Sequence, residues 1–292
     1  MKATIIVNAY TEAENADYQP LRLKEEFEKL GVKADIVKND GSLCKIANEK
    51  TLCTLNADFC IFLDKDKYLL SALEKAGIKT FNCRRAIEDC DDKMLTLLKL
   101  ADCGIKIPDT IPAPLCYTAN AKISENFTDE IINSLGLPLV IKTAYGSLGS
   151  GVFLAENRER LTDLNEKLKL VPHLYQRYIE SSFGRDVRVI VIGNRVIGAI
   201  ERISDGDFRS NLSLGGHGKV FPVTDDLSRI AKQVSALLNL DYCGIDFLFD
   251  EDGFSVCEVN SNAFFKGFES ITGINVANIY CKHVISRISE NR

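Results

Sequence analysis

The chain has 292 residues, of which 36 are Lys or Arg and 41 are Asp or Glu, so its net charge is −5 at pH 7. This balance gives no reason to expect nucleic acid as a partner, and no apolar run is long enough to cross a bilayer. The first ten residues lack the basic-then-apolar layout of a signal peptide, so we expect a cytoplasmic protein with neither membrane nor nucleic acid as a partner.

The ten cysteines are scattered through segments that look like strands and helices, and none forms a Cys-x-x-Cys pair. With only three histidines in the chain, a zinc site is not expected. We interpret the cysteines as reduced and mostly buried thiols of a cytosolic protein.

The first part of the chain alternates strand-like and helix-like segments. Residues 2–8 are a short apolar run, and the next segment places Leu23, Phe27 and Leu30 at helical spacing before Gly31. The alternation continues in short segments at residues 32–37, 58–63, 69–76 and 80–83. The pattern predicts a small parallel α/β domain over residues 1–89, and it contains no glycine fingerprint for a dinucleotide after the first strand.

A helix predicted at residues 89–101 begins the next part and carries Lys93 in its first turn. A predicted strand at residues 137–143 then places Lys142 in an apolar run and leads into a glycine-rich loop, residues 145–151. Backbone N–H groups of such a loop can contact phosphates, although no Gly-Lys-Ser/Thr follows and the loop is not a P-loop. A phosphate clamp and a flexible hairpin both fit this segment, and the preceding lysine favours the clamp.

The rest of the chain predicts an antiparallel region followed by helices. Its expected strands lie at residues 174–179, 186–193 and 196–202, and a polar, glycine-rich loop follows them. Amphipathic helices are expected at residues 228–238 and about 274–288.

One predicted hairpin, residues 243–262, brings acidic side chains together. Its two apolar, β-rich strands flank a short acidic turn that ends in glycine. A three-residue loop would place Asp250 opposite Phe254 and would therefore place Asp246 opposite Glu258.

Asn260 would share the face of Glu258, because side chains alternate along a strand. Two carboxylates and an amide oxygen on one face repel one another, but they are suitable ligands for Mg²⁺ or Mn²⁺. A solvated acidic face is equally consistent with this hairpin alone.

Four segments in order carry a family resemblance: VIKTAYGSLGSGVFLAE, QRYIESSFGRDVRVIVIGNRVIGAIER, GDFRSNLSLGG and IDFLFDEDGFSVCEVNSN. Together they resemble the ATP-grasp ligases, and most closely the RimK-type α-L-glutamate ligases, over roughly residues 90–288. The resemblance implies an α/β (α+β) ATP-grasp fold preceded by the small parallel N-terminal α/β domain. Its central subdomain would cover residues 90–180 and its C-terminal subdomain residues 181–292.

The resemblance also implies the residues around the cofactors. Those expected to bind ATP are Lys93, Lys142, Gln176, Arg177, Tyr178, Ile179, Asp186, Arg209, Ser210 and Asn211. Those expected to hold two Mg²⁺ or Mn²⁺ ions are Asp246, Glu258 and Asn260.

The implied reaction activates a carboxylate as an acylphosphate with release of ADP, and an amine then attacks the acyl carbon to give an amide. Arg188 and Arg202 are the candidates to stabilise the acylphosphate oxyanion. A two-residue turn at Gly193-Asn194 would place these arginines on opposite faces of the hairpin. Either the hairpin carries a bulge or only one arginine has this role.

The segment after Asn260 departs from the family pattern, because the usual Ser-Pro-Gly turn is absent. Ser261, Asn262 and Lys266 are candidate substrate contacts, and Phe264 and Phe265 would line the acceptor pocket. We expect L-glutamate or a similar amino acid to be added to an amine of a protein, peptide or coenzyme. Alternatives are a ligase for another amino acid or for an amino-group carrier protein, and a non-catalytic ATP-binding interaction module. The chain could also form a homo-oligomer.

Overall fold

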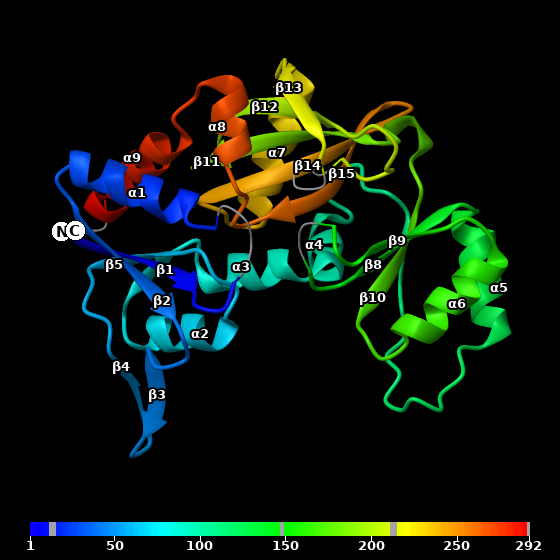
Figure 1. Cartoon of the computed structure of the whole chain (residues 1–292), viewed down its shortest axis with the longest axis horizontal. Coiled ribbons are helices and arrows are strands. Elements are labelled where there is room, and N and C mark those ends of the chain that lie inside the picture. The colour runs from blue at the N-terminus through cyan, green and yellow to red at the C-terminus, as the bar shows by residue number, and fades with distance from the viewer. Residues whose placement is uncertain (12–15, 147–148, 211–214, 291–292) are drawn as a thin grey trace.

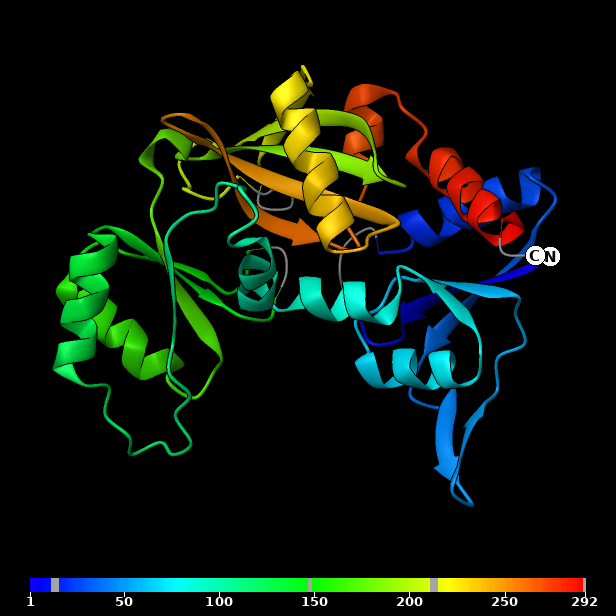
Figure 2. The same cartoon turned by 180° about the vertical axis from the view of Figure 1, so that it is seen from behind.

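The computed structural model describes residues 1–11, 16–146, 149–210 and 215–290, and its architecture is mixed α/β. In Figures 1 and 2 the N-terminal strands and the central strands lie at opposite ends of the molecule. The five-stranded C-terminal sheet lies between these two ends, with helices on both of its faces.

The N-terminal strands form the predicted parallel sheet. Strand β1 (Lys2–Asn8) lies between β2 (Lys33–Asn39) and β5 (Phe59–Phe62), and β6 (Lys79–Phe81) pairs with β5. The strand order β2-β1-β5-β6 therefore reverses direction between β1 and β5. In parallel sheets the carboxyl ends of strands at such a point border a crevice that commonly binds ligands.

Helices cover both faces of this sheet. Helix α1 (Tyr18–Lys29) and the C-terminal helix α9 (Val276–Ser289) share one apolar core with it, and α2 (Lys67–Lys75) packs on the other face. An unpredicted hairpin of β3 (Cys44–Ala47) and β4 (Lys50–Cys53) projects from this region (Figure 1). Its turn has positive φ at both central residues but contains no glycine, which explains why the usual hairpin signal is absent.

The helix predicted at residues 89–101 is in fact two helices, α3 (Arg84–Asp91) and α4 (Lys93–Leu100). Asp92 separates them, and its side chain accepts hydrogen bonds from the first amides of α4. Lys93 is consequently the first residue of α4, and its backbone N–H donates to the Ala144 carbonyl at 3.0 Å. This break fixes Lys93 beside the glycine-rich loop.

The central sheet is antiparallel and has the order β7-β10-β8-β9. Two helices that the sequence did not predict, α5 and α6, pack against one apolar core with it. The bounds are β7 Thr110–Pro112, β8 Leu139–Thr143, β9 Val152–Ala155, β10 His173–Arg177, α5 Glu125–Leu135 and α6 Arg158–Leu168.

The C-terminal sheet is antiparallel, with the order β13-β12-β11-β14-β15. Helix α7 packs on one face, while α8 and α9 pack on the other. A 3₁₀ turn, η1, precedes the first strand. The bounds are η1 Glu180–Ser182, β11 Arg185–Ile192, β12 Arg195–Ile203, β13 His217–Phe221, α7 Asp225–Leu237, β14 Tyr242–Asp250, β15 Gly253–Asn260 and α8 Lys266–Thr272.

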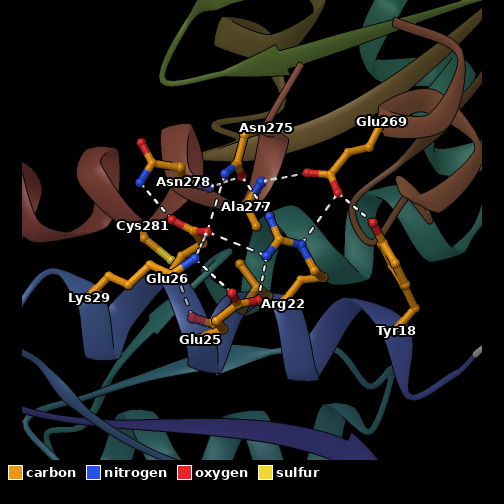
Figure 3. A network of polar contacts seen from close by, with 11 residues as sticks. Tyr18, Arg22, Glu25, Glu26, Lys29, Glu269, Asn275, Ala277, Asn278 and Cys281 are labelled. Carbon is orange, nitrogen blue, oxygen red and sulfur yellow. Dashed lines mark hydrogen bonds and ion pairs between the residues drawn. The ribbon is translucent and has the colours of Figure 1, made fainter. Parts of the chain in front are cut away.

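A polar network joins α1 to α8 and α9 (Figure 3). The Tyr18 hydroxyl donates to Glu269 at 2.7 Å. The buried Glu26 carboxylate accepts hydrogen bonds from Asn278 at 2.7 Å, Asn275 at 3.2 Å and Lys29 at 3.0 Å. Burial alone would raise the pKa of Glu26, but these hydrogen bonds lower it to about 2.

Candidate active site

A pocket of about 890 Å³ lies between the central sheet and the C-terminal sheet. It contains every residue expected at ATP except Asn211, which lies outside the described residues. Arg202, Asp246 and Glu258 line the same pocket. The expected nucleotide residues and part of the expected metal and catalytic sets therefore come together in one place.

Two lysines lie at one end of this pocket. Lys142 is buried on β8, and its Nζ lies 3.3 Å from the Cys257 Sγ. The Lys93 Nζ donates to the Gly146 carbonyl at 3.0 Å and lies 3.8 Å from the Glu258 carboxylate. Burial lowers the pKa of Lys93, and the nearby carboxylate opposes this shift. Two cationic side chains beside a glycine-rich loop suit a polyanion such as the phosphates of a nucleotide.

The glycine-rich loop folds back on the strand before it. The Gly151 carbonyl accepts a hydrogen bond from the Thr143 N–H at 2.9 Å, and a Cβ at position 151 would lie 2.0 Å from the Thr143 Oγ1. Only glycine permits this close approach. Arg209 donates to the Gly149 carbonyl at 2.9 Å and pairs with Asp207, so the polar loop around Arg209 is tied to the glycine-rich loop.

The segment from Gln176 to Ile179 forms another wall of the pocket. The Gln176 amide donates to the Thr110 Oγ1 at 2.9 Å, which ties this side chain to β7. The Tyr178 hydroxyl is buried and has no hydrogen-bond partner among the described residues. A buried polar atom without a partner in the wall of a pocket is a candidate contact for a heterocyclic base.

The two candidate arginines lie on one face of the C-terminal sheet. The β11–β12 pairing shifts by one residue between Ile190 and Val191, so the hairpin carries a bulge. With this bulge Arg202 lies opposite Asp186, two residues from Arg188 on β11. Of the two alternatives left open by the sequence, the structure contains the bulge.

Both arginines bind Asp246. Arg188 donates from Nε and Nη2 to the two carboxylate oxygens, each at 2.7 Å, and Arg202 adds a contact at 3.0 Å. Arg202 also makes a bidentate pair with Asp186. Burial alone would raise the pKa of Asp246, but Arg188 and Arg202 hold it below its usual value. The expected repulsion between unliganded carboxylates is thus wrong for Asp246, because the two guanidinium groups neutralise its charge.

The predicted register of the acidic hairpin is half right. The turn has two residues and pairs Asp250 with Gly253, so the predicted pairing with Phe254 is wrong. A one-residue shift between Asp246 and Phe247 then restores the predicted pairing of Asp246 with Glu258.

The donor set fits a hard divalent cation. Asp246 and Glu258 face each other across the strands, and Asn260 follows on the face of Glu258. The Asn260 Nδ2 is buried without a hydrogen-bond partner among the described residues, so turning this amide over would present its oxygen there instead. Oxygen ligands of this kind are those that Mg²⁺ prefers. In the described part of the chain, no group of three or more His, Cys, Asp or Glu side chains has the arrangement of a metal site.

None of the expected substrate residues lines this pocket. The Ser261 carbonyl accepts a hydrogen bond from Asn82 at 2.8 Å, and Lys266 begins α8 with its Nζ 5.7 Å from the centre of the Tyr18 ring. Phe265 is fully buried in the core with Tyr18 and Tyr242, so its predicted place in the wall of a pocket is wrong. Asn262 and Phe264 instead line a second cavity, next to β1.

Comparison with known proteins gives the family. The model of the RimK-like ATP-grasp domain matches residues 90–284. The chain belongs to the RimK-like ATP-grasp family. Residue Cys257, which the sequence did not single out, lines the pocket beside Lys142, and the bulge of β15 places it there.

Relatives and solved structures agree with this assignment. The chain is 39% identical over 234 residues to beta-citrylglutamate synthase B of Homo sapiens, a match that covers 78% of this chain and 58% of that protein. It is 38% identical over 226 residues to N-acetylaspartylglutamate synthase A of Homo sapiens, covering 76% of this chain and 56% of that protein. The chain thus spans less than two thirds of the length of these relatives.

D-alanine–D-alanine ligase from Bacillus anthracis, complexed with ATP, superposes with a TM-score of 0.76 at 16% identity, over 99% of this chain and 98% of that one. This likeness confirms the predicted ATP-grasp fold. Within the described ranges, no helix has the length and apolar character to cross a membrane.

Proposed function

We propose that the protein is an ADP-forming carboxylate–amine ligase with L-glutamate as one substrate. The observation that carries the proposal is the layout of the pocket between the two antiparallel sheets. Its lysines lie at a glycine-rich loop, and the arginine–carboxylate cluster lies on the C-terminal sheet beside them. This layout suits transfer of a phosphoryl group to a carboxylate.

The nucleotide would lie with its base against the segment from Gln176 to Ile179 and its phosphates towards Lys93, Lys142 and Arg209. Ser210 and Asp186 line the same pocket and are further proposed contacts, as is Asn211. Asp246, Glu258 and Asn260 would hold two Mg²⁺ or Mn²⁺ ions, which would neutralise phosphate charge when bound.

The chain's own side chains would act on the acyl group. An oxygen of the substrate carboxylate attacks the γ-phosphorus, and the bond to ADP breaks, which leaves an acylphosphate. The amine then attacks the acyl carbon, inorganic phosphate leaves, and the amine nitrogen loses a proton. Arg188 and Arg202 would stabilise the oxyanion of the acyl group, and their place on one face beside Asp246 supports this role.

Glutamate could take either part in this reaction. It could supply the activated carboxylate and be added to an amine of a protein, peptide or coenzyme. The names of the two human relatives favour the other arrangement as a second candidate. Citrate and N-acetylaspartate carry no free amine, so glutamate must supply the amine in β-citrylglutamate and N-acetylaspartylglutamate.

The test is ADP release with Mg-ATP, L-glutamate and a panel of second substrates, followed by mass spectrometry of the product. The panel contains citrate, N-acetylaspartate and amine-bearing peptides. The product mass should equal the sum of the two substrates less one water. N-acetyl-L-glutamate decides the arrangement, because its blocked amine leaves only the carboxylate to react. Nucleotide binding without ADP release under any combination would favour the non-catalytic interaction module.

We further propose a division at residues 1–89, 90–180 and 181–292 and a cytoplasmic location. Contacts from Ser261, Asn262 and Lys266 to the second substrate are part of the same proposal. All three residues lie in the segment that directly follows Asn260, the last proposed cation ligand in the chain.

A further inference from the structure

A second cavity, of about 1060 Å³, lies at the carboxyl ends of β1 and β5. This is the point at which the strand order of the N-terminal sheet reverses. Its walls come from β1, β2, the start of α1, and the segment that carries Asn262 and Phe264. None of the residues expected at ATP lines this cavity, so it is distinct from the nucleotide pocket.

The Gln19 side chain is the decisive feature of this cavity. Gln19 is only 2% exposed, and its Oε1 has no hydrogen-bond partner among the described residues. The Asn262 Nδ2 donates to the Leu63 carbonyl at 2.8 Å, and the Gln19 Nε2 donates to the Asn262 Oδ1 at 3.0 Å. A backbone carbonyl can only accept, so this relay fixes both amide orientations. The Gln19 Oε1 is therefore an acceptor without a partner among the described residues, and a donor group of a ligand would satisfy it.

Charged side chains indicate which donor and which ligand. Asp17 lines the cavity beside Gln19 and caps no amide of α1, so a cationic donor such as an ammonium group is favoured. Lys38 lines the cavity from β2 and provides the opposite charge. A small molecule with both an ammonium group and a carboxylate matches this arrangement.

The cavity adjoins the proposed reaction centre. Asn262 follows Asn260 by two residues, a span of at most about 7 Å along the chain. A Cβ at Gly244 would lie 2.5 Å from the Ala263 side chain and 3.6 Å from the Arg188 side chain. The segment that carries Asn262 thus packs beside Arg188, the arginine proposed to stabilise the acyl group.

The network of Figure 3 holds the two walls of the cavity in place. Tyr18 precedes Gln19 in the chain, donates to Glu269 in α8 at 2.7 Å, and stacks edge-on against Phe265 with ring centres 6.1 Å apart. The start of α1 and the start of α8 are therefore fixed relative to each other. Such support keeps a binding group in position before the ligand arrives.

We propose that this cavity is the L-glutamate site. The ammonium or amine nitrogen of glutamate donates to the Gln19 Oε1 beside the Asp17 carboxylate, and a glutamate carboxylate pairs with Lys38. The inference rests on the proposed function, and it adds the residues that select an acidic amino acid.

The experiment measures binding of L-glutamate by calorimetry in the presence of Mg-ADP. Gln19→Met removes the acceptor with little change in volume, and we expect the Kd for L-glutamate to rise roughly ten- to a hundredfold, as for a hydrogen bond to a charged group. Lys38→Met should lower the preference for L-glutamate over L-glutamine. Lys33→Met changes a lysine of the same strand outside the cavity lining and should bind L-glutamate as the wild type does.

A ligand change gives a matching test, because glutarate lacks the ammonium group. Wild-type protein should bind glutarate at least about tenfold more weakly than L-glutamate, and Gln19→Met should reduce this difference. The inference is overturned if wild-type protein does not bind L-glutamate, or if Gln19→Met and Lys38→Met both bind it like wild type. If Gln19→Met does not fold, the Lys38→Met result decides.

ADP release, measured in parallel, separates the two proposals. Glutamate-dependent ADP release together with unaltered glutamate binding in both variants removes only the cavity assignment. Weakened glutamate binding in the variants, with no ADP release from wild type under any combination of substrates, supports the cavity and removes the ligase activity.

Discussion

Arg188 and Asp246 form a bidentate pair, with Nε to Oδ1 and Nη2 to Oδ2 both at 2.7 Å. Asp246 is 4% exposed, and Arg202 approaches the same carboxylate at 3.0 Å. The proposed cation ligand is therefore also the counter-charge of two guanidinium groups. Loss of one member of a buried ion cluster leaves an uncompensated charge, which is strongly destabilising.

Asp246→Asn should accordingly abolish turnover and also lower the free energy of unfolding by about 3 kcal/mol. Urea unfolding followed by circular dichroism measures the second effect, and ADP release measures the first. Glu258→Gln is the matched control. Glu258 is half-buried and lies 3.8 Å from the Lys93 Nζ, so its loss should cost less than about 1 kcal/mol while turnover is still lost. Equal destabilisation by both substitutions would contradict the special role of Asp246.

Lys142→Ala should weaken the stabilisation of the protein by Mg-ATP. A ligand that binds only the folded state raises the melting temperature by mass action, and Lys142 is proposed to contact the phosphates. The measurement is the change in melting temperature with and without Mg-ATP. Lys45→Ala on β3, remote from the pocket lining, should show the wild-type shift. An unchanged shift in Lys142→Ala would place the phosphates elsewhere.

Cys257→Ala should leave kcat within about threefold of wild type. Burial raises the pKa of the Cys257 thiol, although Lys142 lowers it, so the thiol stays protonated near neutral pH and is a poor nucleophile. Acylphosphate chemistry also needs no thiol. The readout is steady-state ADP release. A loss of kcat beyond a hundredfold, with nucleotide affinity retained, would show that Cys257 takes part in the reaction.

The sequence allowed the prediction of the acidic pairing but not of the bulge that produces it. Val256 and Val259 are three residues apart, and both are buried in the core under α7. A regular strand would turn them to opposite faces, whereas one extra residue turns both inward. Val196 and Ala199 repeat this spacing in β12. Paired apolar residues at a spacing of three within a strand were therefore the available signal for both bulges.

Contacts between residues far apart in the chain could not be predicted from local sequence patterns. Phe264 and Phe265 are equally apolar in the sequence, but only Phe265 meets Tyr18 and Tyr242, which come from distant parts of the chain. The sequence around Gln19 does not indicate its proposed role in ligand binding, because that role depends on hydrogen bonds that link Gln19 to Asn262 and Asn262 to Leu63. The nucleotide residues could be predicted because each family motif is a run of neighbouring residues, whereas the second cavity depends on single contacts between residues 199 and 243 positions apart.

The stability of the protein should fall as the pH decreases below about 4.5. The hydrogen bonds to Glu26 lower its pKa to about 2 in the folded state, against an ordinary value of 4.5. A carboxylate whose pKa is depressed by folding stabilises the protein above its unfolded pKa, and this contribution is lost as the pH falls towards the folded pKa. Glu26→Gln should reduce the free energy of unfolding at pH 7 by about 3 kcal/mol and flatten its pH dependence between pH 4.5 and 2. Identical pH profiles for the variant and wild type would rule out this contribution.

Phe264→Ala and Phe265→Ala should separate substrate binding from stability in two adjacent residues. Phe264 is 41% exposed and lines the second cavity, whereas Phe265 is fully buried. Phe265→Ala should lower the free energy of unfolding by about 3–5 kcal/mol, because it leaves a cavity among packed aromatic rings. Phe264→Ala should change stability by less than about 1 kcal/mol, since a half-exposed ring loses little buried area, and should raise the KM for L-glutamate with the KM for ATP unchanged. Urea unfolding and paired kinetics measure the two effects. If Phe264→Ala instead alters ATP and glutamate kinetics equally, its ring does not belong to a separate glutamate site.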